Sequence, residues 1–175
     1  IDISKVTYFD LNNEINIPVN GQIQLGKDKE ALEAFLNENV KPNTKQFSSI
    51  KERINYLIQN NYYEEEFISK YSFEFIEKLY DYLKKEDFHF KTFMAAYKFY
   101  AQYALKTDDN AYYLENFIDR VATNALYFGD GDEKLALELA DELIHQRYQP
   151  ATPSFLNAGR KRRGELVSCF LIQMT

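Results

Sequence analysis

Residues 72–85, SFEFIEKLYDYLKK, decide the fold class of this chain. Their apolar side chains recur at spacings of three and four residues, which places them on one face of a helix. Ser72 stands before the run and can cap its first turn through its hydroxyl oxygen. The stretch therefore predicts an amphipathic helix with one buried stripe, formed by Phe75, Ile76, Leu79, Tyr80 and Leu83.

The same helical period appears upstream of this stretch. Residues 28–40 form one segment, which must end before Pro42 because proline lacks an amide donor and disrupts the preceding turn. A second segment begins at Ser48 or Ser49, and Glu52 completes a capping-box pattern with Ser49. The predicted stripes are Ala31, Leu32, Phe35 and Leu36 in the first segment and Ile50, Ile54, Leu57 and Ile58 in the second.

Three further helical segments are predicted downstream. Thr92 is placed to cap the first. The acidic pair at 108–109 precedes the second, which the glycines at 129–131 interrupt. Asp132 is placed to cap the third, which must end before Pro150. Their stripes are Phe93, Ala96, Tyr97, Tyr100, Tyr103 and Ala104, then Tyr113, Leu114, Phe117, Ile118, Val121 and Leu126, then Leu135, Leu139, Leu143 and Ile144.

The two ends of the chain carry strand patterns instead. Residues 15–19 and 23–25 alternate apolar and polar side chains around Asn20-Gly21, which indicates a hairpin. Pro18 weakens its first arm by removing a ladder donor. Residues 151–154 are expected to be extended and turn-like. Residues 165–173, ELVSCFLIQ, form a nearly continuous apolar run that is typical of a strand covered on both faces.

The predicted fold is therefore mainly α, with about six helices and a C-terminal strand. A strand covered on both faces needs neighbouring strands for its backbone donors and acceptors, and one weak hairpin cannot supply them. We accordingly expect the chain to be part of a larger domain.

Composition excludes several classes of function. The chain has 175 residues, a net charge of -6 and a pI near 5.1, which argues against binding to nucleic acid. It has no signal peptide and no apolar run of membrane-spanning length, so we expect a cytoplasmic protein with no membrane partner. A single cysteine, Cys169, excludes an internal disulfide and a multi-cysteine zinc cluster. His89 and His145 show no metal-ligand spacing, and no metal site is predicted.

Cys169 is the one soft nucleophile in the chain. It can be a small buried hydrophobe in a core strand, or a redox thiol whose partner lies elsewhere. Ser168, the preceding residue, can be an ordinary solvent-facing strand residue or a hydrogen-bonding group beside the thiol.

The basic run Arg160-Lys161-Arg162-Arg163 also has two interpretations. Such a run is most often a solvated loop, but it can bind phosphates or an acidic partner surface. Its flanking glycines, Gly159 and Gly164, form neither a Walker motif nor a dinucleotide-binding fingerprint.

Two stretches near the C-terminus point to a family. Residues 146–159, QRYQPATPSFLNAG, and residues 163–171, RGELVSCFL, closely resemble the large (α) subunit of class Ib ribonucleotide reductases. The resemblance implies three regions. They are residues 1–50, a candidate remnant of the ATP-binding cone of longer classes; residues 51–149, a helical domain; and residues 150–175, the start of a catalytic ten-stranded α/β barrel.

The resemblance also implies site residues. Cys169 matches the redox-active cysteine of the first barrel strand, which acts with a second, downstream cysteine to reduce the ribose. Thr152, Ser168 and Cys169 match positions at the substrate, a ribonucleoside diphosphate. Ser154 stands where many relatives have threonine, and it keeps the hydroxyl group.

As an enzyme of this family, the full-length protein would be an oxidoreductase that makes deoxyribonucleotides for DNA replication. The resemblance implies no cofactor in this chain. It implies a dimanganese- or diiron-tyrosyl radical in a separate small beta subunit, a thioredoxin or glutaredoxin-like reductant, nucleotide effectors and a homodimer. We expect residues 1–175 alone to be inactive, because one thiol cannot form the disulfide. The alternative is a stand-alone helical module that binds nucleotides and regulates the reductase.

Overall fold

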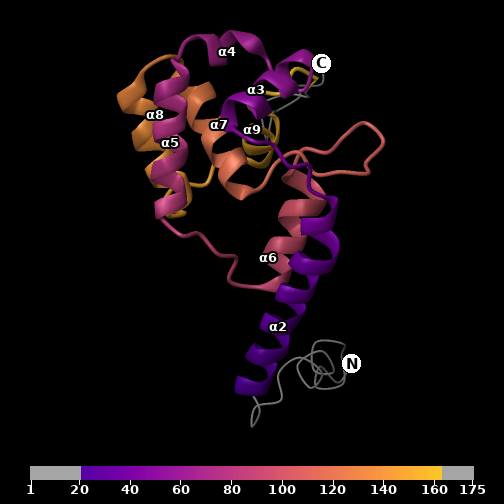
Figure 1. Ribbon diagram of the computed structural model, residues 1–175. Helices are drawn as coiled ribbons and strands as arrows, with labels where there is room; N and C mark the ends of the chain where they lie inside the picture. Colours follow the sequence, from indigo (N-terminus) through magenta and orange to yellow (C-terminus); the bar gives the residue numbers. More distant parts are fainter. Residues whose placement is uncertain (1–20, 163–175) are drawn as a thin grey trace, which may run out of the picture. The chain divides into compact units, whose positions relative to one another are not determined.

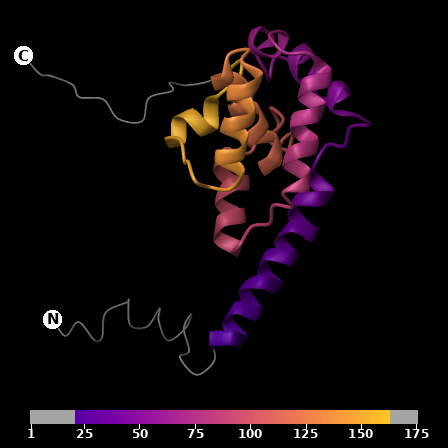
Figure 2. The same cartoon turned by 90° about the vertical axis from the view of Figure 1, so that its left-hand side faces the viewer.

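The computed structural model describes residues 21–162, with side chains from residue 27 onward. These residues divide into two compact units. One unit comprises 21–42 and 90–97, and the other comprises 43–89 and 98–162. Helices account for the regular structure of both units (Figures 1 and 2), so the mainly α fold class is confirmed.

The first unit is built from α2 (Gly21–Phe35), the π-helical turn η3 (Leu36–Val40) and most of α6 (Phe93–Lys98). The ring of Phe35 meets the edge of Phe93 with centroids 5.6 Å apart. Asp28 accepts a hydrogen bond of 3.3 Å from the backbone amide of Phe93. Thr92 caps α6 as predicted, since its hydroxyl accepts from the amide of Ala95.

The predicted hairpin is wrong in its second arm. Residues 23–25 lie inside α2, which begins at Gly21 instead of near Asp28. A two-stranded hairpin is marginal without further strands, whereas extending an existing helix fixes one residue for each new hydrogen bond. The first arm, residues 15–19, lies outside the described residues.

The second unit packs its helices around α7 (Phe117–Gly129), which contacts α4 (Glu65–Ser69), α5 (Phe73–Lys85), α8 (Glu133–Ile144) and α9 (Thr152–Asn157). Figures 1 and 2 show α5, α7 and α8 side by side. The predicted stripe of α5 is buried throughout, with Ile76, Leu79 and Leu83 fully inaccessible. The remaining elements are α3 (Ile50–Gln59) and the π-helical turn η5 (Phe99–Tyr103), which continues α6.

Three predicted helix starts in this unit are confirmed. The side chains of Ser49, Ser72 and Asp132 each accept a hydrogen bond from an amide of the first helical turn. The capping box at α3 is modified, because Glu52 turns back to the amide and hydroxyl of Ser48 instead of to Ser49. Either arrangement satisfies amides that a helix start leaves without partners.

The predicted start of the fifth helix is wrong. Tyr113 and Leu114 lie before α7, which begins after Asn116 with a complete capping box to Asp119. The preceding segment turns back on itself instead, because Asp109 accepts from Thr107 and from the amide of Ala111. Side chains of aspartate and threonine favour such turns over helix interiors by bonding to nearby backbone groups.

The predicted stripe of α8 is confirmed at Leu143 and Ile144, but Ala136 and Ala140 are buried where Leu135 and Leu139 were predicted. Ala136 and Ala140 are fully buried, while Leu135 is 39% exposed. Small side chains let α7 and α8 approach closely, and at Gly129 an added Cβ would lie 3.0 Å from that of Ala136. Leucine fills the outer flank because the contact face has no room for it.

The segment before the predicted barrel strand is helical instead of extended. Thr152–Asn157 form α9, with proline in its first turn, where its missing amide costs nothing. Within residues 21–162, β pairing is limited to isolated bridges. The predicted C-terminal strand, residues 165–173, lies outside the described residues. None of the helices between residues 21 and 162 has the length and apolar character needed to span a membrane.

The register of α8 gives a first prediction. We expect Ala140→Leu to lower the free energy of unfolding of the chain by about 1–3 kcal/mol through overpacking. Leu135→Ala, on the exposed flank, should change it by about 0.5 kcal/mol or less. Urea unfolding followed by circular dichroism measures both. The reverse order would show that the leucine face is the buried one.

Candidate functional site

The candidate site is the segment 150–160, which side chains of α7 fasten to the second unit. Arg120 donates one hydrogen bond of 2.8 Å to the carbonyl of Leu156 and another to the carbonyl of Ala158. Asn124, one turn later, donates to the carbonyl of Phe155 at 3.0 Å. Both side chains are buried, so these bonds are shielded from water.

Thr152 is the one predicted substrate-binding residue that the structure describes. It lies exposed in the first turn of α9, and its hydroxyl is 3.2 Å from that of Tyr103. The aromatic ring of Tyr103 meets Phe155 of the same helix edge to face. Ser168 and Cys169 lie outside the described residues, so their positions relative to Thr152 stay predictions.

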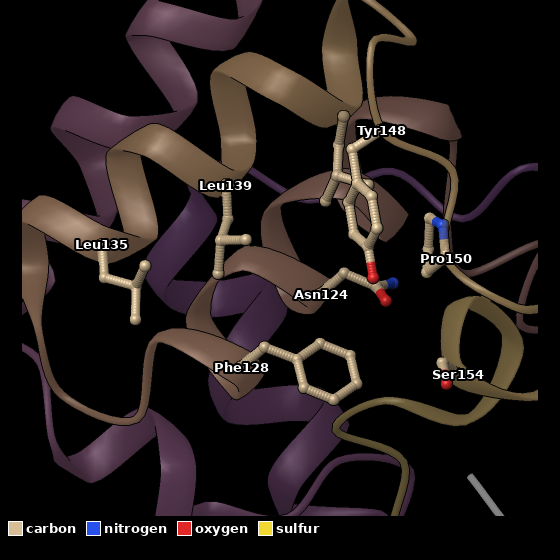
Figure 3. A pocket seen from close by; sticks show the side chains of 8 residues that line it. Asn124, Phe128, Leu135, Leu139, Tyr148, Pro150 and Ser154 are labelled. Carbon is tan, nitrogen blue, oxygen red and sulfur yellow. The ribbon is translucent and has the colours of Figure 1, made fainter. Parts of the chain in front are cut away.

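A pocket of about 280 Å³ lies beside α9 (Figure 3). Phe128 of α7 and Leu139 of α8 face Pro150 and Ser154 across it. Asn124 is among the lining residues, and its Oδ1 atom is buried without a hydrogen-bond partner.

A buried carboxylate, that of Glu115, pairs with the arginines that hold this segment. Glu115 is 1% exposed and lies 3.0 Å from an Nη of Arg160 and 3.5 Å from the Nε of Arg120. It accepts a hydrogen bond of 2.9 Å from the amide of Leu105 and another from the hydroxyl of Tyr63. Two guanidinium groups thus share one carboxylate, and each also binds backbone carbonyls.

A second buried arginine joins the same cluster. Arg53 of α3 donates to the carbonyl of Leu114 at 3.0 Å and to the hydroxyl of Tyr80 at 3.1 Å. Its guanidinium lies 3.5 Å from the carboxylate of Asp119. Arg53 therefore holds the residues just before α7, and its partners Leu114, Tyr80, Tyr63 and Asp119 all lie outside the segment 150–160.

The two buried acids of the cluster differ in their pKa. Burial raises the pKa of Glu115, but Arg120, Arg160 and Arg53 outweigh it, and the pKa falls to about 2. Burial likewise raises the pKa of Asp119, and here Arg53 offsets it only in part, so the pKa stays above its ordinary value. Burial raises the pKa of the Tyr63 phenol to about 12, so Tyr63 stays protonated and donates to Glu115.

The basic run at 160–163 is not uniformly a solvated loop. Arg160 is directed inward, with its side chain 11% exposed, and it binds Glu115 and the carbonyl of Tyr103. Arg162 stays exposed and pairs with Asp108 at 2.9 Å. Arg163 lies outside the described residues. The partner of the first cation is thus an acid of the chain itself, not a phosphate.

Each of the two histidines lies next to an acidic side chain. His145 ends α8 and binds Glu86 at 2.8 Å, and His89 lies on the surface beside Asp87. Within residues 21–162, no group of three or more histidine, cysteine or acidic side chains is arranged to hold a metal ion.

The buried polar residues Glu115, Arg120 and Asn124 were not predicted from the sequence, although the sequence contains a signal for them. Arg120 and Asn124 stand four residues apart within the apolar run of α7, where polar side chains must find buried partners. Glu115 lies just before that run. Because α7 was expected to begin earlier, these three residues were not distinguished from an ordinary helix surface.

The close approach at Gly159 gives a prediction for this site. Gly159 has φ +76°, and an added Cβ would lie 2.6 Å from a ring carbon of Phe67 and 2.7 Å from the methyl of Thr123. We expect Gly159→Ala to destabilise the chain by about 2–4 kcal/mol from backbone strain plus overpacking. Gly131→Ala is the matched control.

Gly131 also has positive φ, at +92°, but its nearest neighbour is the flexible side chain of Lys70 at 3.3 Å. Gly131→Ala should therefore cost only the strain, about 1–2 kcal/mol. Thermal unfolding of both variants measures the difference. Equal losses would show that segment 158–160 does not pack against Phe67 and Thr123.

Acid unfolding gives a second prediction for the cluster. The lowered pKa of Glu115 stabilises the fold fully above pH ~4.3, the unfolded value, and this stability is lost as the pH falls toward 2. The raised pKa of Asp119 acts oppositely, because the folded chain takes up that proton first. We expect the two groups together to give a net loss of at most about 2 kcal/mol between pH 4.5 and 2.

Urea unfolding at each pH measures this loss. Glu115→Gln should flatten the loss below pH 4, although the variant starts from lower stability because it leaves buried cations unpaired. Asp119→Asn should steepen the loss near pH 4–5, since it removes the opposing group. An unchanged slope in Glu115→Gln would contradict the assignment.

Comparison with known proteins identifies the family. A family model described as the ribonucleotide reductase N-terminal region matches residues 8–88, and one described as the ribonucleotide reductase all-alpha domain matches residues 89–163. The chain is 52% identical over 164 residues to the ribonucleoside-diphosphate reductase NrdEB subunit alpha of Bacillus subtilis, which covers 94% of the chain.

Two further relatives carry similar names. The chain is 49% identical over 167 residues to another ribonucleoside-diphosphate reductase subunit alpha of Bacillus subtilis and 50% identical over 147 residues to that of Mycoplasma genitalium, which cover 95% and 84% of the chain. The chain spans only 15–24% of the length of these relatives. As the resemblance predicted, the chain belongs to the ribonucleotide reductase family and corresponds to the N-terminal region of the alpha subunit.

Proposed function

We propose that the full-length alpha subunit reduces ribonucleoside diphosphates to 2'-deoxyribonucleoside diphosphates, and that this chain supplies part of its substrate site. Residues 51–149 form the helical domain in this proposal, and 150–175 begin the catalytic barrel. The observation that carries the proposal is the fastening of the Thr152 segment by Arg120 and Asn124. A rigidly held hydroxyl loses little further freedom when it binds a ligand.

Thr152 and Ser168 are the proposed substrate contacts. Each hydroxyl can donate to a phosphate or ribose oxygen, and the hydroxyl of Thr152 is exposed for that purpose. A neighbouring hydroxyl, that of Tyr103, lies 3.2 Å away and orients the threonine side chain. Ser154, two residues further along the same short helix, lines the adjacent pocket.

Cys169 is the proposed redox thiol. Reduction of the ribose replaces its 2'-hydroxyl by hydrogen and releases water, which requires two electrons and two protons. Two thiols supply both when they join as a disulfide. Residues 1–175 contain a single cysteine, so the second thiol belongs to another part of the protein. A thioredoxin or glutaredoxin-like protein would then reduce the disulfide by thiol exchange.

The remaining partners follow from the same proposal. A separate small beta subunit of class Ib type would supply the radical from a dimanganese or diiron centre. Nucleotide effectors and a homodimer of alpha subunits would complete a cytoplasmic enzyme. Residues 1–50 are the proposed remnant of an ATP-binding cone.

The redox role is tested in the full-length alpha subunit with its beta subunit. We expect Cys169→Ser to abolish multiple turnover with the protein reductant, because serine cannot form the disulfide. Substrate affinity, measured by equilibrium dialysis with a ribonucleoside diphosphate, should stay within about twofold, since serine keeps the size and a hydrogen-bonding group. Retained turnover in Cys169→Ser would refute the proposal, and the affinity measurement controls for misfolding.

A further inference from the structure

We infer that Arg120 and Asn124 are positioning residues for substrate binding, and that Glu115 sets the geometry of Arg120 and of the Tyr103 backbone. This inference rests on the proposed function, because it assumes that Thr152 contacts the substrate. It assigns a role in substrate affinity to two buried side chains of α7, which act through the backbone of the segment that carries Thr152.

Helix α9 is short, with only six residues. Six residues form too few hydrogen bonds to hold a helix in water, so its position depends on tertiary contacts. Arg120 and Asn124 bind two of its carbonyl groups, at Phe155 and Leu156, and the carbonyl of the C-cap residue Ala158. The end of α9 that follows Thr152 is therefore fixed to α7 by polar bonds with defined direction.

The Thr152 hydroxyl also contacts a side chain outside α9, that of Tyr103. Tyr103 lies 3.2 Å from it, and the carbonyl of Tyr103 accepts a hydrogen bond from Arg160. Arg160 pairs with the same carboxylate, Glu115, that faces Arg120. One buried acid thus holds the backbone of Tyr103 through one arginine and the backbone of α9 through the other.

Position 120 requires an arginine for this role. Burying a guanidinium is costly and requires a compensating acid, which Glu115 provides. A lysine could keep the charge but could not reach two carbonyl groups as a rigid fork. Apolar packing could also hold α9, but it is not directional, so the fork of Arg120 specifies where the segment lies.

The test uses the full-length alpha subunit with its beta subunit. Thr152→Ala is the reference and should raise KM for the ribonucleoside diphosphate by about tenfold, the value of one hydrogen bond to a charged group. Arg120→Lys should raise KM several-fold with a smaller change in kcat, because a ground-state contact is displaced. Arg53→Lys is the matched control, since Arg53 is also a buried arginine but bonds to Leu114, Tyr80 and Tyr63 instead of to α9.

A double variant separates positioning from general loosening. If Arg120 acts through Thr152, then Arg120→Lys combined with Thr152→Ala should have the KM of Thr152→Ala alone. Thermal unfolding of each variant reports stability independently. Asn124→Ala, which removes one hydrogen bond to α9 and no charge, gives the same comparison if Arg120→Lys does not fold.

The outcomes separate the two claims. A raised KM in Arg120→Lys or Asn124→Ala, an unchanged KM in Arg53→Lys and a non-additive double variant support the positioning role. Equal KM in Arg120→Lys and Arg53→Lys, or additive effects, would overturn it while leaving the substrate contact intact. An unchanged KM in Thr152→Ala would instead overturn the proposed contact, and the positioning role with it.

Discussion

The second unit depends on the burial of one carboxylate, Glu115, among guanidinium groups. Two of them, Arg120 and Arg160, lie 3.5 and 3.0 Å from it, and both also bind backbone carbonyls of distant segments. A buried charge without partners would cost several kcal/mol, so each member of this cluster requires the others. The cluster therefore links α7, the π-helical turn before it and α9 into one arrangement with little freedom to slip.

This constraint connects the helical domain to the proposed chemistry. The proposed redox thiol, Cys169, is not among residues 21–162, yet helix α7 holds the segment that carries the exposed Thr152. The apolar core of α5, α7 and α8 gives stability, while the polar bonds from α7 give direction. In the proposed function, such a domain influences substrate binding indirectly, because it positions the backbone that carries Thr152.

Much of the fold was predictable because local patterns carry it. The stripe of α5 and the caps at Ser49, Ser72 and Asp132 depend on spacing and on side chains within one turn, and all were confirmed. The predictions failed where two local solutions compete. The alternation at 23–25 suited a strand but lies in a helix, and the acids at 108–109 suited a cap but form a turn. The site roles of Thr152, Ser168 and Cys169 rest on the resemblance and stay predictions.

The sequence by itself determined the helical class, most helix boundaries and the family. Helical periodicity, caps and the motif at residues 146–171 are all properties of residues close together in the chain. Only the tertiary structure decided which face of α8 is buried and which polar residues meet. Ala140 is fully buried and Leu139 only partly, because the distance between two packed helices depends on both of them. Glu115, Arg120 and Arg160 span 46 residues of sequence, and long-range pairing of charges leaves no local periodicity.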